Sequence, residues 1–207
     1  RVNPDVDART HEKITTGKKE NKFGINLGKL QGVMDRLTQM EHIKLIGIHC
    51  HIGSQITDMS AFRNLTIRIN EIQEELEARG ITVPNLNLGG GLGIDYYHPN
   101  HLSIPSFDNY FAAIHHLLEQ RPGQQVHFEP GRSIVAQCGT LISRVLYVKE
   151  GDTKRFAILD AGFTELIRPA MYDANHRIEN ISSDEPVVMA SQYNCRQLPA
   201  AYYSDTI

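Results

Sequence analysis

Three apolar segments that each end in polar residues and glycine set the tightest limit on how this chain can fold. They begin at Leu45, Val83 and Val126, roughly 40 residues apart, and a helix-length segment fills each gap. A strand–helix repeat of this length indicates parallel strands with helices packed outside them. Because α/β proteins place their sites at the carboxyl ends of such strands, the repeat predicts an α/β fold with a site where the three segments end.

One side of each predicted strand is apolar and the other is polar, since side chains alternate between the two faces of a strand. The apolar faces comprise Ile46, Ile48 and Cys50; Leu86 and Leu88; and Val126 and Phe128. The polar faces comprise Gly47, His49 and His51; Asn85 and Asn87; and His127 and Glu129. We therefore expect the polar faces to carry the chemistry.

Helical patterns lie between these segments. Apolar residues at helical spacing predict helices near residues 29–41, 60–79 and 108–120. Thr57 or Asp58 can cap the second of these helices, and Asp108 the third. Residues 23–26 are interpreted as a short link, and the polar stretch 8–21 as a loop.

The pattern changes after Arg132. Residues 139–150 are rich in β-branched side chains, Gly151 and Asp152 are typical of a hairpin turn, and residues 155–161 indicate another strand. Because no helical stripe separates these strands, we expect an antiparallel β domain. The sequence is thus divided into residues 1–138, an α/β part, and residues 139–207, the start of the β domain.

Composition excludes several classes of protein. The 207 residues are 41% hydrophobic and 22% charged, with a formal net charge of -3, as in an ordinary globular protein. The sequence has no basic block, membrane-spanning apolar run or signal-peptide pattern, so neither nucleic acid nor a membrane is an expected partner. Three cysteines far apart favour a reducing compartment, the cytoplasm. The chain does not begin with methionine, and we expect a fragment.

His49 and His51 could both reach one metal ion, because they lie two residues apart on one strand face. A metal site needs further ligands with outer-shell support, and Glu129 and Asp160 have no metal-like spacing, so no metal is predicted. The two histidines could instead be satisfied inside a barrel. The Gly-Ser pair directly after them favours a bound ligand.

Gly89, Gly90 and Gly91 end the second segment. Successive glycine amides can form an anion-binding nest, which predicts a phosphate site. The alternative is a tight turn with positive φ, which explains one glycine easily and three poorly.

Glu129 and Arg132 place a carboxylate inside the predicted barrel mouth and a guanidinium at its rim. A buried glutamate is costly unless it is paired or acts on a ligand, and arginine has the planar fork for phosphate or carboxylate. An internal ion pair between the two is the alternative. Arg168 and Tyr172 offer a second guanidinium and a phenol, which could equally lie on a solvated loop.

Four motifs, in this order, resemble the diaminopimelate decarboxylases. They are His-Cys-His-Ile-Gly-Ser-Gln at 49–55, Gly-Gly-Gly-Leu-Gly-Ile-Asp-Tyr at 89–96, Glu-Pro-Gly-Arg-Ser at 129–133, and residues 160–174. That family belongs to the fold-type III pyridoxal-phosphate decarboxylases, which combine a (β/α)8 TIM-type barrel with a C-terminal β domain. The resemblance runs from Arg1 to about Val188 and implies the C-terminal half of the barrel, followed by the start of the antiparallel β domain.

The resemblance implies pyridoxal 5′-phosphate as the cofactor. His51 would stack on the pyridine ring and Glu129 would pair with its nitrogen, so that the ring can serve as an electron sink. The implied cofactor-binding residues are His51, Ser54, Gly89, Gly90, Gly91, Glu129, Gly131 and Arg132. The implied substrate-binding residues are Arg132, Arg168 and Tyr172, and two arginines suit meso-2,6-diaminopimelate, which the family converts to L-lysine and CO2.

The chain departs from the family pattern in two places. The family's Schiff-base lysine lies on a strand before anything present here, and Lys44 lies at the wrong end of its strand. The family's Cys-Glu-Ser-type segment should follow Val188, but residues 189–207 do not match it, so Cys195 is not assigned as a catalytic cysteine. No catalytic residue is predicted within the chain, and the isolated fragment is expected to be inactive.

The resemblance also implies a homodimer with shared active sites. Three alternatives stay open: a sister decarboxylase acting on ornithine, arginine or a carboxylated polyamine; a non-catalytic relative that keeps the fold; and, last, a metal-dependent barrel hydrolase.

Overall fold

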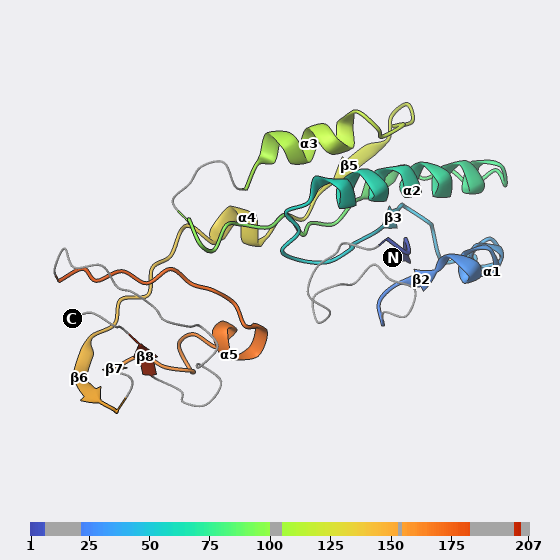
Figure 1. Ribbon diagram of the computed structural model, residues 1–207. Helices are drawn as coiled ribbons and strands as arrows, with labels where there is room; N and C mark the ends of the chain where they lie inside the picture. The colour runs from blue at the N-terminus through green and yellow to red at the C-terminus, as the bar shows by residue number, and fades with distance from the viewer. Residues whose placement is uncertain (7–21, 100–104, 153–154, 183–200, 204–207) are drawn as a thin grey trace. The chain divides into compact units, whose positions relative to one another are not determined.

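The computed structural model describes residues 1–6, 22–99, 105–152, 155–182 and 201–203. The chain divides into two compact units (Figure 1). The first unit consists of Arg1–Ile94 and Leu102–Gln137, and the second of Asp95–His101 and Cys138–Ile207. The predicted loop 8–21 and the divergent tail, apart from 201–203, lie outside the described residues.

The strands of the first unit are parallel, as predicted. Strands β3 (Ile48–His49), β4 (Asn85–Asn87) and β5 (Gln125–His127) form one sheet in that order. Strands β1 (Val2–Asn3) and β2 (Ile25–Asn26) form a second parallel pair. The interpretation of residues 23–26 as a link was wrong, because the Ile25 amide donates to the Arg1 carbonyl at 2.8 Å and opens a strand.

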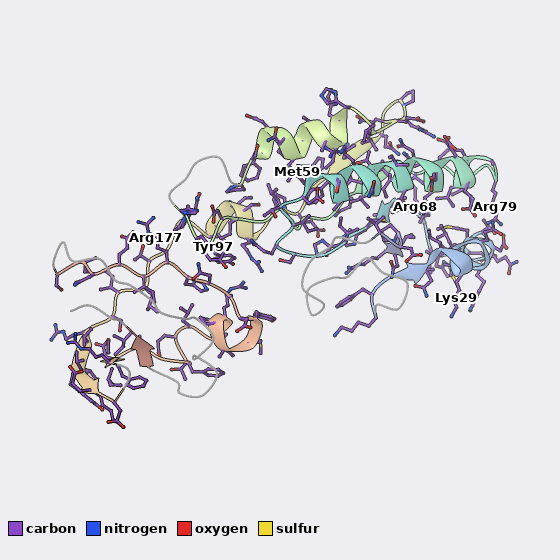
Figure 2. The ribbon with its side chains drawn as sticks, in the orientation of Figure 1. Lys29, Met59, Arg68, Arg79, Tyr97 and Arg177 are labelled. Atoms are coloured by element: carbon purple, nitrogen blue, oxygen red, sulfur yellow. The ribbon has the colours of Figure 1, made fainter. Side chains whose placement is uncertain are left out.

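Four helices accompany these strands among the described residues: α1 (Leu27–Leu37), α2 (Met59–Glu77), α3 (Phe107–His115) and α4 (Arg132–Val135). The predicted apolar stripe of α2 is confirmed, since all five of its members are buried in the core: Phe62, Leu65, Ile69, Ile72 and Leu76. Asp58 caps α2 by accepting from the Ser60 amide at 2.8 Å. Just beyond the other end of α2, Arg79 pairs with Asp35 of α1 (Figure 2).

Helix α3 is shorter than predicted and has a different cap. The Ser106 hydroxyl, not the Asp108 carboxylate, accepts a hydrogen bond from the Asn109 amide at 3.3 Å. The helix stops early because Asn70 of α2 binds the chain that follows it. The Asn70 side chain donates to the Leu117 carbonyl at 2.7 Å and accepts from the Glu119 amide at 3.1 Å.

The apolar strand faces pack into the core as predicted, with one exception. Ile48, Cys50, Leu86 and Leu88 are all buried in it. Ile46 was predicted to join them but is 65% exposed, because β3 begins only at Ile48.

The second unit contains an antiparallel sheet in the order β6 (Val145–Glu150), β7 (Arg155–Leu159) and β8 (Ala201–Tyr203), and helix α5 (Arg168–Tyr172). The predicted antiparallel pairing of the first two strands is confirmed, with Glu150 opposite Arg155. Among the helices that the structure describes, none is long and apolar enough to cross a membrane.

Candidate cofactor site

The polar strand faces of the first unit meet at one end of the three-stranded sheet. His49 of β3, Asn87 of β4 and His127 of β5 lie side by side in the register of the sheet. Because the strands are parallel, the segments that follow them emerge at the same edge. These segments contain His51, the glycine run Gly89–Gly91, and Glu129. The sequence-based placement of the site at this edge is consistent with the register.

Glu129 is more exposed than the sequence suggested. Its side chain is 53% exposed, so the carboxylate is solvated and not buried. The Asn87 amide donates to Oε1 of Glu129 at 2.7 Å, and Nε2 of His49 lies 3.7 Å from Oε2. Within the described residues these are its side-chain partners, so the alternative of an internal ion pair with Arg132 is not realised.

His51 carries a neutral imidazole whose orientation is set by the glycine run. Nδ1 of His51 accepts a hydrogen bond from the Gly90 amide at 3.2 Å, which leaves the ring proton on Nε2. Burial lowers the pKa of His51 and the positive charge of Arg1 lowers it further, and together they outweigh the opposite effect of the Glu129 carboxylate. The ring is therefore uncharged at neutral pH and presents a flat aromatic face.

The glycine run is required by close backbone packing. A Cβ atom at Gly90 would overlap the carbonyl oxygen of Glu129, and Gly91 has φ +102°, where side chains are strained. Two of the three glycine amides already have protein acceptors: the Gly89 amide donates to Oδ1 of Asn87 at 2.9 Å, and the Gly90 amide to His51. Close packing thus accounts for the glycines without a ligand, and the phosphate site at this run stays a prediction.

Arg132 is positioned by a residue of the β3–α2 loop. Nη1 of Arg132, the first residue of α4, donates to Oε1 of Gln55 at 3.0 Å. Gln55 has a left-handed backbone with φ 59°, and its Nε2 donates to the Ile94 carbonyl at 2.6 Å. The half-buried Ser54 precedes Gln55 in this loop, and Gly131 is the N-cap of α4.

Arg168 and Tyr172 belong to the second unit, where they form an aromatic cluster. The Arg168 guanidinium carbon lies 5.2 Å from the centre of the Tyr96 ring and 5.5 Å from that of the Tyr172 ring. The His176 ring contacts Tyr96 at 5.2 Å between centroids. The alternative of a solvated loop is wrong for Arg168, because its Nε atom is buried, with no hydrogen-bond partner among the described residues.

The amino-acid sequence of residues 1–136 matches the family model described as the pyridoxal-binding domain of pyridoxal-dependent decarboxylases. The match covers more than half of the chain. The chain belongs to the pyridoxal-dependent decarboxylase family. The match confirms the resemblance to the pyridoxal-phosphate decarboxylases.

Relatives of this chain carry a narrower name than the family model does. A diaminopimelate decarboxylase of Bacteroides thetaiotaomicron is 49% identical over 248 aligned positions, which cover 100% of this chain and 64% of the relative. A diaminopimelate decarboxylase of Pseudomonas aeruginosa is 46% identical and covers 84% of this chain and 41% of its own.

Solved structures agree with the sequence comparison. Diaminopimelate decarboxylase from Helicobacter pylori complexed with L-lysine superimposes with a TM-score of 0.80 at 36% identity, over 91% of this chain and 46% of that one. The chain thus spans less than two thirds of the length of these relatives.

The chemistry of the site suits the cofactor of this decarboxylase family, pyridoxal 5′-phosphate. A solvated carboxylate, Glu129, can accept a hydrogen bond from a protonated ring nitrogen, and the neutral ring of His51 can stack on a heterocycle. Arg132 supplies a guanidinium for an anion. In the described part of the chain, no three His, Cys, Asp or Glu side chains are grouped to hold a metal ion.

Four contact residues were given no role from the sequence: Asn87, Gln55, Tyr96 and His176. The first could have been assigned, since it shares the polar strand face with Glu129. The role of Gln55 depends on its left-handed backbone conformation. The roles of Tyr96 and His176 depend on a contact between residues that are distant in the sequence. Strand periodicity predicts neither feature.

Proposed function

We propose that the chain is part of a pyridoxal-phosphate-dependent decarboxylase that converts meso-2,6-diaminopimelate to L-lysine and CO2. The observation that supports this substrate is the 49% identity to a diaminopimelate decarboxylase along the whole chain. That span includes Arg168 and Tyr172, the residues expected to bind the substrate.

The proposed architecture is the C-terminal half of a (β/α)8 barrel in residues 1–138, followed by the start of a β domain in 139–207. The consecutive parallel strands β3, β4 and β5 support the first assignment. The antiparallel strands β6 and β7 support the second.

In this proposal pyridoxal 5′-phosphate supplies a protonated heterocycle that accepts the electron pair left when a carboxylate departs as CO2. Glu129 would accept the hydrogen bond of the ring nitrogen, and His51 would stack on the ring. The phosphate would be held by Ser54, Gly131, Arg132 and the run Gly89, Gly90 and Gly91. Since two glycine amides have protein acceptors, we expect Arg132 to carry much of the phosphate contact.

The substrate carboxylates are proposed to bind Arg132, Arg168 and Tyr172. Arg168 is suited to this task because Tyr96 and Tyr172 flank its guanidinium while its Nε lacks a hydrogen-bond partner among the described residues. A buried guanidinium nitrogen without an acceptor is costly, and a carboxylate would remove that cost.

The assembled enzyme is proposed to be a cytoplasmic homodimer with shared active sites. The thiol of Cys50, buried in the core, is consistent with a reducing compartment. We expect these 207 residues alone to form no lysine, because the resemblance assigns the Schiff-base lysine and the catalytic cysteine to segments that the chain does not match.

The test uses the protein captured from its natural source with an antibody against this chain. Its turnover is compared on meso-diaminopimelate, ornithine and arginine, and its mass is measured after borohydride reduction. Lysine formation together with a reduced pyridoxyl-phosphate adduct is expected. Faster turnover of ornithine or arginine would favour a sister decarboxylase, and absence of an adduct would favour a non-catalytic relative.

A further inference from the structure

We infer that Asn87 is a positioning residue that joins the glycine run to the Glu129 carboxylate. The inference rests on the proposed function only in so far as Glu129 is the partner of the cofactor nitrogen. The joining itself is a property of the chain's own hydrogen bonds.

Asn87, the last residue of β4, uses both ends of its side-chain amide. Its Nδ2 donates to Oε1 of Glu129 at 2.7 Å, and its Oδ1 accepts from the Gly89 amide at 2.9 Å. A carboxylate can only accept and a backbone amide can only donate, so these two partners fix the orientation of the Asn87 amide.

A third hydrogen bond closes a ring. The Glu129 amide donates to the Gly89 carbonyl at 2.7 Å. Gly89, Asn87 and Glu129 are therefore linked pairwise, so a displacement of the glycine run displaces the carboxylate as well. The close approach of Gly90 to the Glu129 carbonyl holds the same two segments together from the backbone side.

This ring of three hydrogen bonds leaves one oxygen of the Glu129 carboxylate for a ligand. Oε1 of Glu129 is taken by Asn87, whereas Oε2 accepts no hydrogen bond within the described residues and lies 3.7 Å from Nε2 of His49. Hydrogen bonds to ionised groups are about twice as strong as neutral ones, so Asn87 can hold the Glu129 carboxylate in one orientation. An aspartate in its place could not donate to a carboxylate when ionised.

Two substitutions in the full 207-residue chain separate the two hydrogen bonds. Asn87→Asp keeps an acceptor for the Gly89 amide and removes the donor to Glu129. Asn87→Leu removes both. Asn85→Asp is the matched control, because Asn85 lies on the same strand and face but contacts the Ile46 carbonyl and His127 instead.

The first readout needs no cofactor. Nuclear magnetic resonance would follow hydrogen exchange of the Gly89 amide and the carboxyl carbon signal of Glu129. We expect Gly89 exchange to rise about tenfold in Asn87→Leu alone, as the loss of one hydrogen bond implies. The Glu129 signal should shift in both Asn87 variants. It should not shift in Asn85→Asp. General loosening of the strand would change both signals in every variant, and would not raise Gly89 exchange in Asn87→Leu alone.

The second readout is the dissociation constant for pyridoxal 5′-phosphate, measured by titration. Both Asn87 variants should bind about tenfold more weakly, the loss expected when a hydrogen bond to a charged group is removed, and Asn85→Asp should stay within about twofold. Unchanged Gly89 and Glu129 signals, or unchanged affinity in a variant whose Glu129 signal has shifted, would overturn the inference. Cofactor uptake by the unaltered chain is a separate test of the proposed cofactor site, and the Gly89 and Glu129 signals decide on Asn87 with or without it.

Discussion

At the residue scale, the protonation state of His51 is tied to the geometry of the glycine run. Its Nδ1 accepts from the Gly90 amide, so a proton on that nitrogen would break the hydrogen bond. The lowered pKa of His51 and its hydrogen bond thus favour the same neutral form. The sequence predicted a histidine at the site but not which nitrogen carries its proton, since that depends on a neighbour from another strand.

This coupling predicts a pH dependence of stability. The pKa of His51 in the folded chain lies below its ordinary value of 6.5, so the unfolded chain binds more protons and the free energy of unfolding falls as the pH drops through 6.5. His49 and His176, whose pKa values are also lowered by burial, act in the same direction. We expect urea unfolding to show a smaller free energy at pH 5.5 than at pH 7.5.

His51→Gln is the matched variant for this effect, because glutamine can accept from the Gly90 amide without titrating. The fall in stability between pH 7.5 and 5.5 should be smaller in the variant than in the unaltered chain. An equal or larger fall would mean that His51 is not neutral in the folded state.

Gly90 makes a second residue-scale prediction. A methyl group there overlaps the Glu129 backbone, which cannot swing aside as a side chain could, so Gly90→Ala should lower the free energy of unfolding by about 2–4 kcal/mol. Gly32→Ala is the control, because Gly32 lies in α1 with nothing near its Cβ position; it should raise that free energy by about 0.5–1 kcal/mol. Thermal and urea unfolding would measure both, and a tolerated Gly90→Ala would contradict the packing.

At the scale of elements, strand faces and helix stripes were predictable because they repeat along the chain. The stripe from Phe62 to Leu76 and the buried face of Ile48 and Cys50 follow from periodicity alone. Element ends were not predictable in this way. Strand β2 and the early end of α3 depend on hydrogen bonds to Arg1 and Asn70, which lie far away in the sequence.

The end of α3 can be tested through Asn70. Asn70→Ala removes the partners of the Leu117 carbonyl and the Glu119 amide, and should lower the free energy of unfolding by about 1–3 kcal/mol. Asn64→Ala, at an exposed position of the same helix, should change it by less than about 0.5 kcal/mol. Equal effects in urea unfolding would show that Asn70 acts only through helix propensity.

At the scale of the whole molecule, the core of the first unit protects one thiol while another is exposed. Cys50 is fully buried, and burial raises its pKa to about 12, whereas Cys138 is exposed. The thiolate is the reactive form of cysteine, so both burial and charge oppose reaction at Cys50.

Thiol labelling should therefore report on unfolding of the first unit. We expect a maleimide to modify Cys138 in the native chain and Cys50 only when urea unfolds it, as followed by mass spectrometry of the peptides. Native-state labelling of both at similar rates would mean that the β3 region opens without global unfolding.

The way the chain is threaded also limits how it can be exchanged with other sequences. It leaves the first unit after Ile94, returns at Leu102 and leaves again after Gln137. A single recombination point can therefore not transfer the second unit intact, because its segment Asp95–His101, with the Tyr96 that flanks Arg168, would stay behind. A chimaera with a relative would therefore need matched replacements at both segments of the second unit.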